Sequence, residues 1–374
     1  MTHPSSSVFA LVLAGGAGTR FWPASRALRP KQLLPLVGDA PLVRQTVERV
    51  LPLLAEGAGG AGGAWDRVLI ATGAHLAEAT RAILPELAEH RFLLEPAARN
   101  TAPCIAWAAA TVARSDPDAV MMVLPSDHHI VNVERFRSTL HAAIASARGG
   151  VITTIGIQPT RPETGFGYIE VEGAIEDGTA QRGLKFVEKP DVARAAAYVA
   201  GGRHLWNAGM FFFRAKDMVA AVAKYLPAVA RGLEVLDQAA GRGEEEQALA
   251  SVFPSLPSIS IDHGVMDHLP ELAVVPGDFG WSDVGSFQAA WELAEKDEHD
   301  NAAPPGSVLI DARGNYVLDL RTTAPPRRTI AVAGIDHLVV VETDDALLVT
   351  TRERAQEVKQ VVDELKKRGD KDLV

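Results

Sequence analysis

Residues 8–20 read VFALVLAGGAGTR, an apolar run that ends in a glycine-rich turn. The run from residue 8 to 14 carries no charge, which is typical of a buried strand of a parallel sheet. A turn after such a strand lies at the carboxyl edge of an open α/β sheet, where ligands bind. Glycines let backbone N–H groups approach phosphate oxygens closely, and the guanidinium of Arg20 suits a triphosphate. The stretch therefore predicts a phosphate-binding turn.

The turn differs from two common nucleotide-binding motifs. A Rossmann dinucleotide motif requires a third glycine where this chain has Phe21, and a Walker loop requires G-K-[ST]. A dinucleotide oxidoreductase is therefore the least favoured function. Taken alone, the sequence fits a tight turn without a ligand equally well, so the functional interpretation depends on the motifs that follow.

Alternating apolar runs and helical patterns indicate the fold class. Further strands are predicted at residues 67–72, 119–124 and 151–157, and helices at residues 41–54, 75–87, 102–114 and 133–147. This alternation predicts an α/β fold with a mostly parallel sheet. The segment GAGGAGGA, residues 57–64, has no side chain suited to packing or recognition and is predicted to be a flexible surface loop.

The pattern changes twice in the second half of the chain. After Gly165 short strands are predicted at residues 168–171, 184–188 and 208–213, and after about residue 300 at 307–310, 338–341 and 346–350. We expect a catalytic domain over residues 1–299 and a small β-rich domain over residues 300–374. The latter ends in a predicted helix, residues 352–368, with an apolar stripe at Ala355, Val358, Val362 and Leu365. The stripe is expected to pack within its own domain, and a subunit interface is the alternative.

Composition limits the function classes. The chain has 374 residues, 47% of them hydrophobic, which is enough for a large core. Its net charge of −10 argues against general binding to nucleic acid or to an anionic membrane. Cys104 is the only cysteine and is expected to be an inert core residue. No signal peptide and no run of 18 apolar residues is recognised, so we expect a cytoplasmic protein.

Two polar motifs follow predicted strands. In VLPSDHHI, residues 123–130, Asp127 comes directly after an apolar run and is a candidate Mg²⁺ ligand, although a turn-forming aspartate is the alternative. His128 and His129 do not make a zinc site without further spaced ligands. In LEPAARNTAP, residues 94–103, Asn100 and Thr101 stand at a helix start, where they could bind a ligand or simply cap the helix.

The continuation LAGGAGTRFWPASRALRPKQLLPL, residues 13–36, resembles the signature of the sugar-nucleotide pyrophosphorylases. The resemblance implies a Rossmann-like nucleotidyltransferase domain with a mixed, mostly parallel sheet, followed by a β-helix-like domain. It implies that Arg20 and Lys31 hold the triphosphate and that Asp127 and Asp283, the latter in FGWSDVGSF, bind Mg²⁺. Nucleotide contacts are implied for Leu13, Gly15, Gly16, Gly18 and Thr19.

Two further sets of motifs narrow the resemblance. Residues 94–103 look like the base-recognition segment of the mannose-1-phosphate guanylyltransferases, which implies guanine contacts for Glu95, Asn100 and Thr101. RPETGFGYIE, FVEKP and WNAGMFFF follow in the family order. They imply sugar-phosphate contacts for Gly165, Tyr168, Glu188, Lys189 and Asn207, with Lys189 holding the sugar phosphate. The C-terminus is similar to that of the short, single-activity enzymes, without an isomerase domain.

The implied activity is transfer of GMP from GTP to mannose 1-phosphate, giving GDP-mannose and pyrophosphate, with Mg²⁺ and with Arg20, Lys31 and Lys189 as catalytic residues. A homodimer is a possible assembly. One alternative is another pyrophosphorylase that uses glucose 1-phosphate with UTP or dTTP, against which residues 94–103 argue. A non-catalytic nucleotide-sugar regulator is a second alternative, which the presence of both aspartates and all three cationic residues disfavours.

Overall fold

The structure is a computed structural model that describes residues 7–16, 18–56, 63–322 and 329–374. The chain forms two compact units. The sheet unit comprises residues 1–15, 46–126 and 130–281, and the coil unit comprises residues 16–45, 127–129 and 282–374. The units are defined by contacts in space, and each contains several separate stretches of the chain. They do not test the division expected at residue 300, which stays a prediction. Of the predicted loop over residues 57–64, residues 57–62 lie outside the described part.

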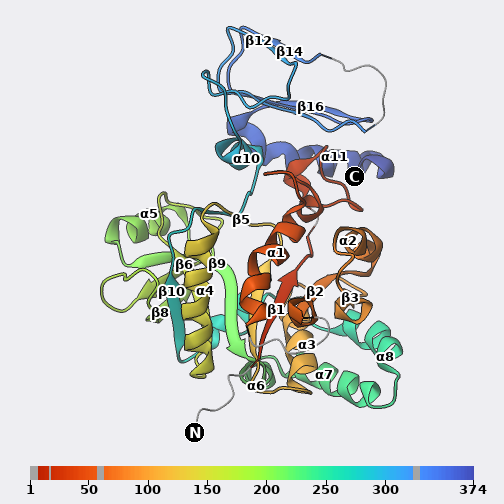
Figure 1. Ribbon diagram of the computed structural model, residues 1–374, viewed down its shortest axis with the longest axis vertical. Coiled ribbons are helices and arrows are strands. Elements are labelled where there is room, and N and C mark those ends of the chain that lie inside the picture. The colour runs from red at the N-terminus through yellow and green to blue at the C-terminus, as the bar shows by residue number, and fades with distance from the viewer. Residues whose placement is uncertain (1–6, 17, 57–62, 323–328) are drawn as a thin grey trace. The chain divides into compact units, whose positions relative to one another are not determined.

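A nine-stranded mixed sheet is the centre of the sheet unit (Figure 1). Its strands in spatial order are β3 (Phe92–Glu95), β2 (Val68–Gly73), β1 (Val8–Leu13), β4 (Val120–Pro125), β9 (His204–Arg214), β6 (Thr153–Ile157), β10 (Leu272–Pro276), β8 (Gln181–Val187) and β7 (Tyr168–Val171). The half from β3 to β4 is parallel, as predicted. In the other half β9 runs antiparallel to both β4 and β6, which makes the whole sheet mixed.

The apolar run at the start of the chain lies in the middle of the parallel half. Ala10, Leu11 and Val12 have no exposed surface, because β1 pairs with β2 on one side and β4 on the other. Such a strand can place its following turn at the carboxyl edge of the sheet, as the sequence predicts.

Helices cover both faces of this sheet (Figure 1). Helices α1 (Leu42–Ala55) and α4 (Val133–Arg148) lie side by side, since Arg137 Nε donates to the Arg49 carbonyl at 2.9 Å. On the other face α3 (Thr101–Ala113) packs against α6 (Ala215–Tyr225) and α7 (Pro227–Ala240). Helix α3 is apolar on all sides and almost wholly buried, and it carries the buried Cys104.

The remaining elements of the sheet unit are short. The predicted helix at residues 75–87 is confined to α2 (Ala77–Ile83), because Leu84 precedes Pro85 and leaves the helical region with φ −123°. Between Gly165 and residue 300 the sequence predicts short strands, whereas the structure also has several helices there. The unit also contains α5 (Val192–Gly201), α8 (Glu245–Val252) and α9 (Ile261–Gly264), while the short pair β5 (His129–Ile130) and β11 (Trp281–Ser282) lies at the unit boundary.

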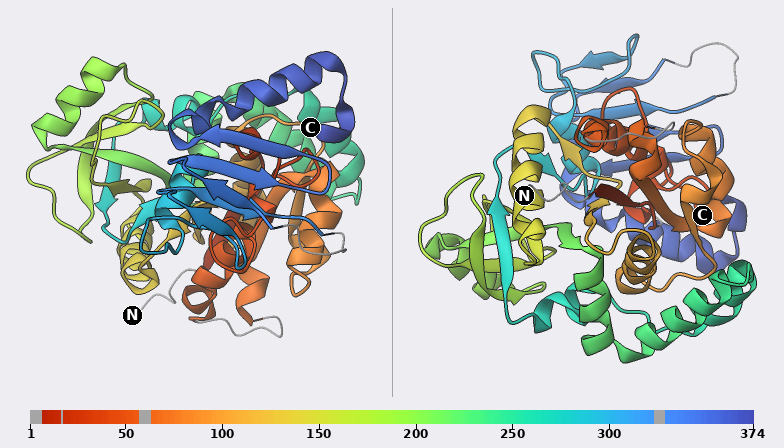
Figure 2. Two further views of the ribbon diagram at one scale, coloured as in Figure 1. Left: turned by 90° about the horizontal axis from the view of Figure 1, so that it is seen from above. Right: turned by 60° about the horizontal axis from the view of Figure 1, so that its bottom comes forward.

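Short parallel strands stack on one another in the coil unit (Figure 2, left). They are β12 (Val308–Ile310), β13 (Tyr316–Asp319), β14 (Ala331–Ala333) and β15 (Leu338–Glu342), and β16 (Leu347–Thr351) runs antiparallel to β15. Val308 pairs with Ala331 and Tyr316 with Val339, so each strand pairs with the one 23 residues further along the chain. A constant spacing of this kind is one turn of a β-helix, which agrees with the expected β-rich domain.

The end of the chain packs within the coil unit. The predicted helix at residues 352–368 consists of a 3₁₀ segment, η8 (Arg352–Glu357), and α11 (Val358–Arg368). All four residues of its stripe are buried, in one cluster with Phe21 and Trp22 from the segment after the glycine-rich turn. The unit also contains α10 (Phe287–Leu293), whose first residue belongs to the same cluster. The stripe therefore packs inside its own unit, as expected.

Two buried asparagines hold the turns of the coil in register. Asn315 has no exposed surface, and its amide Nδ2 donates to Asn301 Oδ1 at 3.0 Å and to the Ile335 carbonyl at 3.1 Å. Its Oδ1 accepts from the Leu338 N–H at 2.8 Å. One fully buried side chain thus connects successive turns and bonds their part-buried backbone groups.

We predict that Asn315→Ala lowers the free energy of unfolding by about 2–4 kcal/mol, because it removes a buried bond to Asn301 and two part-buried bonds to the backbone. Urea denaturation followed by circular dichroism measures this loss. Asn132→Ala is the control: Asn132 caps α4 at the surface, and its loss should cost about 1 kcal/mol. Equal losses for the two variants would contradict the role assigned to Asn315.

Candidate phosphate-binding and sugar-binding residues

The glycine-rich turn follows β1 and leads into a 3₁₀ turn, η1 (Thr19–Phe21). Gly16 has φ 119° and Gly18 φ 56°, conformations that favour glycine. A Cβ at residue 18 would come within 2.6 Å of the Lys31 Cβ, so only glycine lets the turn lie directly on that lysine. The predicted nucleotide contacts of Leu13, Gly15, Gly16, Gly18 and Thr19 stay predictions, and of these residues Gly18 and Thr19 line a cavity.

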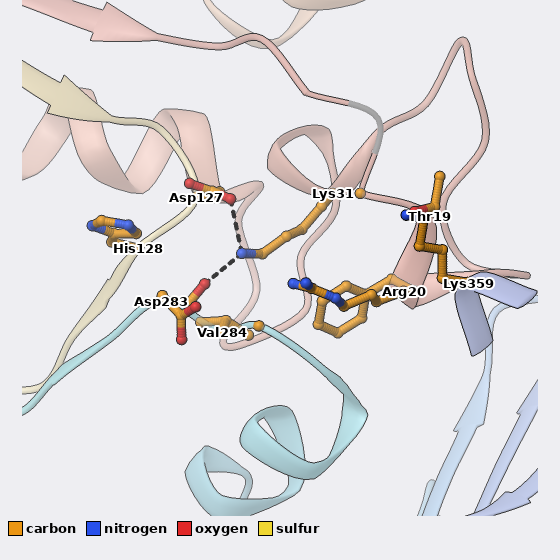
Figure 3. Close-up of a pocket in the computed structure, with 11 residues that line it drawn as sticks. Thr19, Arg20, Lys31, Asp127, His128, Asp283, Val284 and Lys359 are labelled. Atoms are coloured by element: carbon orange, nitrogen blue, oxygen red, sulfur yellow. Dashed lines mark hydrogen bonds and ion pairs between the residues drawn. The ribbon is translucent and has the colours of Figure 1, made fainter. Parts of the chain in front are cut away.

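This cavity, the phosphate cavity, has a volume of about 340 Å³ and belongs wholly to the coil unit (Figure 3). Besides Gly18 and Thr19, four residues predicted from sequence line it, and they come from three distant segments: Arg20, Lys31, Asp127 and Asp283. The other lining residues are Gly18, Thr19, Phe21, His128, Val284, Gly285 and Lys359. Three positive side chains and two carboxylates around a small polar space can bind a phosphate chain together with a divalent cation.

Lys31 is the most deeply buried charged side chain of the cavity, with 6% of its surface exposed. It begins the 3₁₀ turn η2 (Lys31–Leu33). Its Nζ donates to Asp127 Oδ2 at 2.8 Å and to the Asp283 carbonyl at 2.5 Å, and lies 5.8 Å from the centre of the Phe21 ring (Figure 3). A lysine held on three sides is not the ordinary solvated lysine that the sequence alone would allow.

The carboxylate of Asp127 is charged at neutral pH. Burial by itself raises the pKa of Asp127, but the positive charges of Lys31 and His128 outweigh it and hold the pKa below its ordinary value. Asp127 thus offers an anionic oxygen to the cavity.

The backbone beside Asp283 is strained. Val284 is a β-branched residue with φ 44°, a conformation that such residues rarely adopt. Val284 is buried, and its N–H donates to Ser282 Oγ at 3.1 Å, which helps to maintain the turn. Because φ of Val284 sets the orientation of the preceding peptide, the strained turn directs the Asp283 carbonyl toward Lys31. Strain of this kind is concentrated at functional sites and costs about 1–3 kcal/mol.

Arg20 and Lys359 supply charge that no acidic side chain in the described part of the chain neutralises. Both side chains are exposed, and within the described residues neither makes a hydrogen bond or an ion pair. Arg20 was predicted from the glycine-rich turn, whereas Lys359 was missed. The only sequence signal for Lys359 is its position beside Val358 of the apolar stripe.

The two aspartates fit a magnesium ion. Mg²⁺ prefers oxygen ligands and is commonly bound by one or two carboxylates together with substrate phosphates and water. Asp127 and Asp283 line the same cavity and offer this donor set. Among the described residues no group of three or more His, Cys, Asp or Glu side chains is arranged around a common point, as a zinc site would require.

The predicted base-recognition residues lie in the sheet unit, at the end of β3 and the start of α3. Burial raises the pKa of Glu95 to about 7. Asn100, with φ 62°, caps α3 by accepting from the Thr101 N–H at 2.8 Å, and Thr101 Oγ1 accepts from the Ile261 N–H at 2.9 Å. Both side chains therefore have structural partners, and their contact with a base stays a prediction.

Four of the predicted sugar-phosphate residues also lie in this unit on or beside β7, β8 and β9. Asn207 Nδ2 donates to Asp262 Oδ1 at 2.9 Å, and Asn207 Oδ1 accepts from Thr154 Oγ1 at 3.0 Å. Glu188 and Lys189 form an ion pair, with Lys189 in the left-handed region at φ 48°. The structure thus holds one amide within β9 and one ion pair directly after β8.

Asp262 was missed by the sequence analysis. Burial and the nearby charge of Glu188 raise its pKa to about 6, while its bond from Asn207 acts in the opposite direction. In the sequence it stands in SISIDHG, a segment between two recognised motifs, and its bond to Asn207, 55 positions earlier, and its proximity to Glu188 connect it with the sugar set.

Tyr168 is fully buried, and its hydroxyl donates to the Glu163 carbonyl at 2.9 Å. The side chain of Glu163 in turn accepts from the Gly165 N–H at 3.1 Å. Tyr168 therefore positions the turn that contains Gly165, and its predicted contact with the sugar stays a prediction.

Comparisons with known proteins identify the family of this chain. The family model described as nucleotidyl transferase matches residues 9–300, and the model of the MannoseP isomerase/GMP-like beta-helix domain matches residues 307–365. Xanthan biosynthesis protein XanB of Xanthomonas campestris pv. campestris (strain B100) is 40% identical over 97% of this chain and 74% of its own length. Mannose-1-phosphate guanylyltransferase of Escherichia coli (strain K12) is 37% identical, with the same coverage of both chains.

A solved structure has the same fold over nearly the whole chain. The crystal structure of a Thermus thermophilus protein described as a mannose-1-phosphate geranyltransferase superposes with a TM-score of 0.81 at 33% identity, over 96% of this chain and 99% of that one. The family predicted from residues 13–36 is thereby confirmed, as is the α/β domain with a β-helix-like domain behind it. The chain belongs to the nucleotidyl transferase family of enzymes.

Proposed function

We propose that this enzyme transfers GMP from GTP to α-D-mannose 1-phosphate, giving GDP-mannose and pyrophosphate. The observation that carries the proposal is the phosphate cavity, in which the glycine-rich turn, three cationic side chains and two carboxylates meet. The names of the relatives support the choice of substrates, since four of the curated proteins most similar to this chain are mannose-1-phosphate guanylyltransferases.

In the proposed reaction a phosphate oxygen of mannose 1-phosphate attacks the α-phosphorus of GTP in line. The new P–O bond forms as the bond from the α-phosphorus to the bridging oxygen of the β-phosphate breaks, and pyrophosphate leaves. Positioning and charge stabilisation supply most of the catalysis in reactions of this type. Arg20 and Lys31 would neutralise the triphosphate and the leaving pyrophosphate, and Lys189 would hold the sugar phosphate.

A magnesium ion would be held by Asp127 and Asp283 together with substrate phosphates. Its charge would stabilise the negative charge that develops on the phosphate oxygens. The predicted homodimer and the cytoplasmic location stay predictions. Within the described part of the chain, no helix combines the length and the apolar character needed to cross a bilayer.

The first prediction concerns substrate choice. In an assay of pyrophosphate release over a grid of nucleoside triphosphates and sugar 1-phosphates, GTP with mannose 1-phosphate should be the best pair. A preference for UTP or dTTP with glucose 1-phosphate would assign the chain to another pyrophosphorylase. Release with no pair at all would favour a non-catalytic nucleotide-sugar regulator.

The second prediction concerns the two carboxylates. Asp127→Asn and Asp283→Asn should each lower turnover by about 100-fold, since each removes one anionic ligand of a cation that supplies several kcal/mol. The Mg²⁺ concentration for half-maximal activity should rise in both variants. Asp345→Asn is the control, because Asp345 is an exposed aspartate of the same unit that pairs with Arg26. Near-normal rates of both site variants in saturating Mg²⁺ would place the ligands elsewhere.

The third prediction separates Lys31 from Lys189. Loss of one charge-assisted contact costs about 1.5–3 kcal/mol. Lys31→Gln and Lys189→Gln should therefore each weaken the binding of one of the two substrates by about 10-fold to 100-fold. Lys31→Gln should weaken GTP binding measured by calorimetry without sugar phosphate, and Lys189→Gln should leave GTP binding intact while it raises the KM for mannose 1-phosphate.

Lys185→Gln, a change in β8 close to Lys189 in sequence, controls for loss of charge alone. If Lys189→Gln abolishes GTP binding while Lys31→Gln retains it, the two lysines have the opposite roles.

A further inference from the structure

Lys359 of α11 lines the phosphate cavity with Thr19 and Arg20, although it lies more than 300 residues after them in the chain. The resemblance that identified the other cationic residues does not include it. Its position follows from packing in the coil unit.

Helix α11 is firmly attached to the segment after the glycine-rich turn. Val358 and Val362 are buried in the cluster that contains Phe21 and Trp22, and the indole Nε1 of Trp22 donates to the Leu373 carbonyl at 2.7 Å. Lys359 directly follows Val358, so the start of its side chain is fixed beside η1. A flexible C-terminal tail would not hold a charged side chain at one place beside η1.

The charge of Lys359 has no evident structural use. No ion pair or hydrogen bond of its side chain occurs within the described residues, in contrast to Lys367 of the same helix, which pairs with Glu364. Lys359 also lies in the first turn of α11, which contains no acidic residue, and a cation there is unfavourable because it adds to the positive end of the helix dipole. Stability alone therefore does not account for a lysine at this position.

Lys359 also lies at a distinct end of the cavity. Figure 3 shows it beside Thr19 and Arg20, across the cavity from Asp127 and His128. If the aspartates mark the place of the reacting α-phosphate, as the proposed function requires, Lys359 is near the far end of the triphosphate.

We propose that Lys359 is a phosphate-binding residue that contacts the β- and γ-phosphates of GTP and the pyrophosphate formed from them. The assignment rests on the proposed function for the identity of the nucleotide. It makes the C-terminal helix a direct part of the triphosphate site, so that residues of the β-helix-like region take part in substrate binding.

The experiment compares Lys359→Ala, Lys359→Arg and the unchanged full-length protein. In calorimetry with Mg²⁺, Lys359→Ala should bind GTP about 10-fold more weakly and GMP with unchanged affinity, because GMP lacks the β- and γ-phosphates. In the reverse reaction its KM for pyrophosphate should rise by a similar factor, with the KM for GDP-mannose unchanged. Lys359→Arg should recover most of the loss, since it restores the charge.

Lys366→Ala is the matched control, because Lys366 is an exposed lysine of the same helix outside the cavity. The midpoint of thermal unfolding should not fall in Lys359→Ala, which distinguishes loss of a ligand contact from damage to the fold. Equal GTP affinity of Lys359→Ala and Lys366→Ala would overturn the inference, as would an equal loss of GMP binding.

Failure of the proposed function gives a different result. If the unchanged protein binds GTP but forms no GDP-mannose from mannose 1-phosphate, the proposed reaction is wrong, and the comparison of GTP with GMP still decides the role of Lys359.

Discussion

The hydrogen bonds of the Lys31 ammonium hold the phosphate cavity together. One nitrogen connects the segment after the glycine-rich turn, the aspartate after β4 and the turn after β11, which are three separate parts of the chain. Gly18 packs on the backbone of the same lysine, and the Phe21 ring lies beneath its ammonium. Lys31 is only 6% exposed, and burying its charge without these partners would destabilise the fold. The geometry of the cavity and the pairing of this lysine therefore depend on one another.

Much of this arrangement could be predicted from local sequence. The apolar run of β1, the glycines after it and the aspartate after β4 are signals within a few residues, and the resemblance supplied Lys31 and Asp283. Lys359 and Asp262 could not be found in this way, because their surroundings are created by contacts across the fold. The antiparallel direction of β9 could not be predicted either, since an apolar run does not indicate in which direction the neighbouring strands run.

The sheet unit has a connection of its own between two sets of predicted ligand residues. Thr101 accepts from the Ile261 N–H, and the Ala102 N–H donates to the Ile259 carbonyl at 3.1 Å. Asp262, which directly follows Ile261, accepts a hydrogen bond from the Asn207 side chain. The segment from residue 259 to 262 therefore fixes the start of α3 and the amide of β9 at the same time. The short helix α9 is small but positions residues of two sequence motifs.

The spacing of 23 residues in the coil unit has a consequence for how its sequence can vary. Pairing of β12 with β14 and of β13 with β15 depends on the alternation of side chains within each strand, since Val340 faces one cluster and its neighbours Val339 and Val341 face another. A single residue inserted inside a strand would exchange these two faces. The strands of the coil are therefore expected to tolerate inserted residues less well than the segments between them, where the entropic penalty grows only slowly with length.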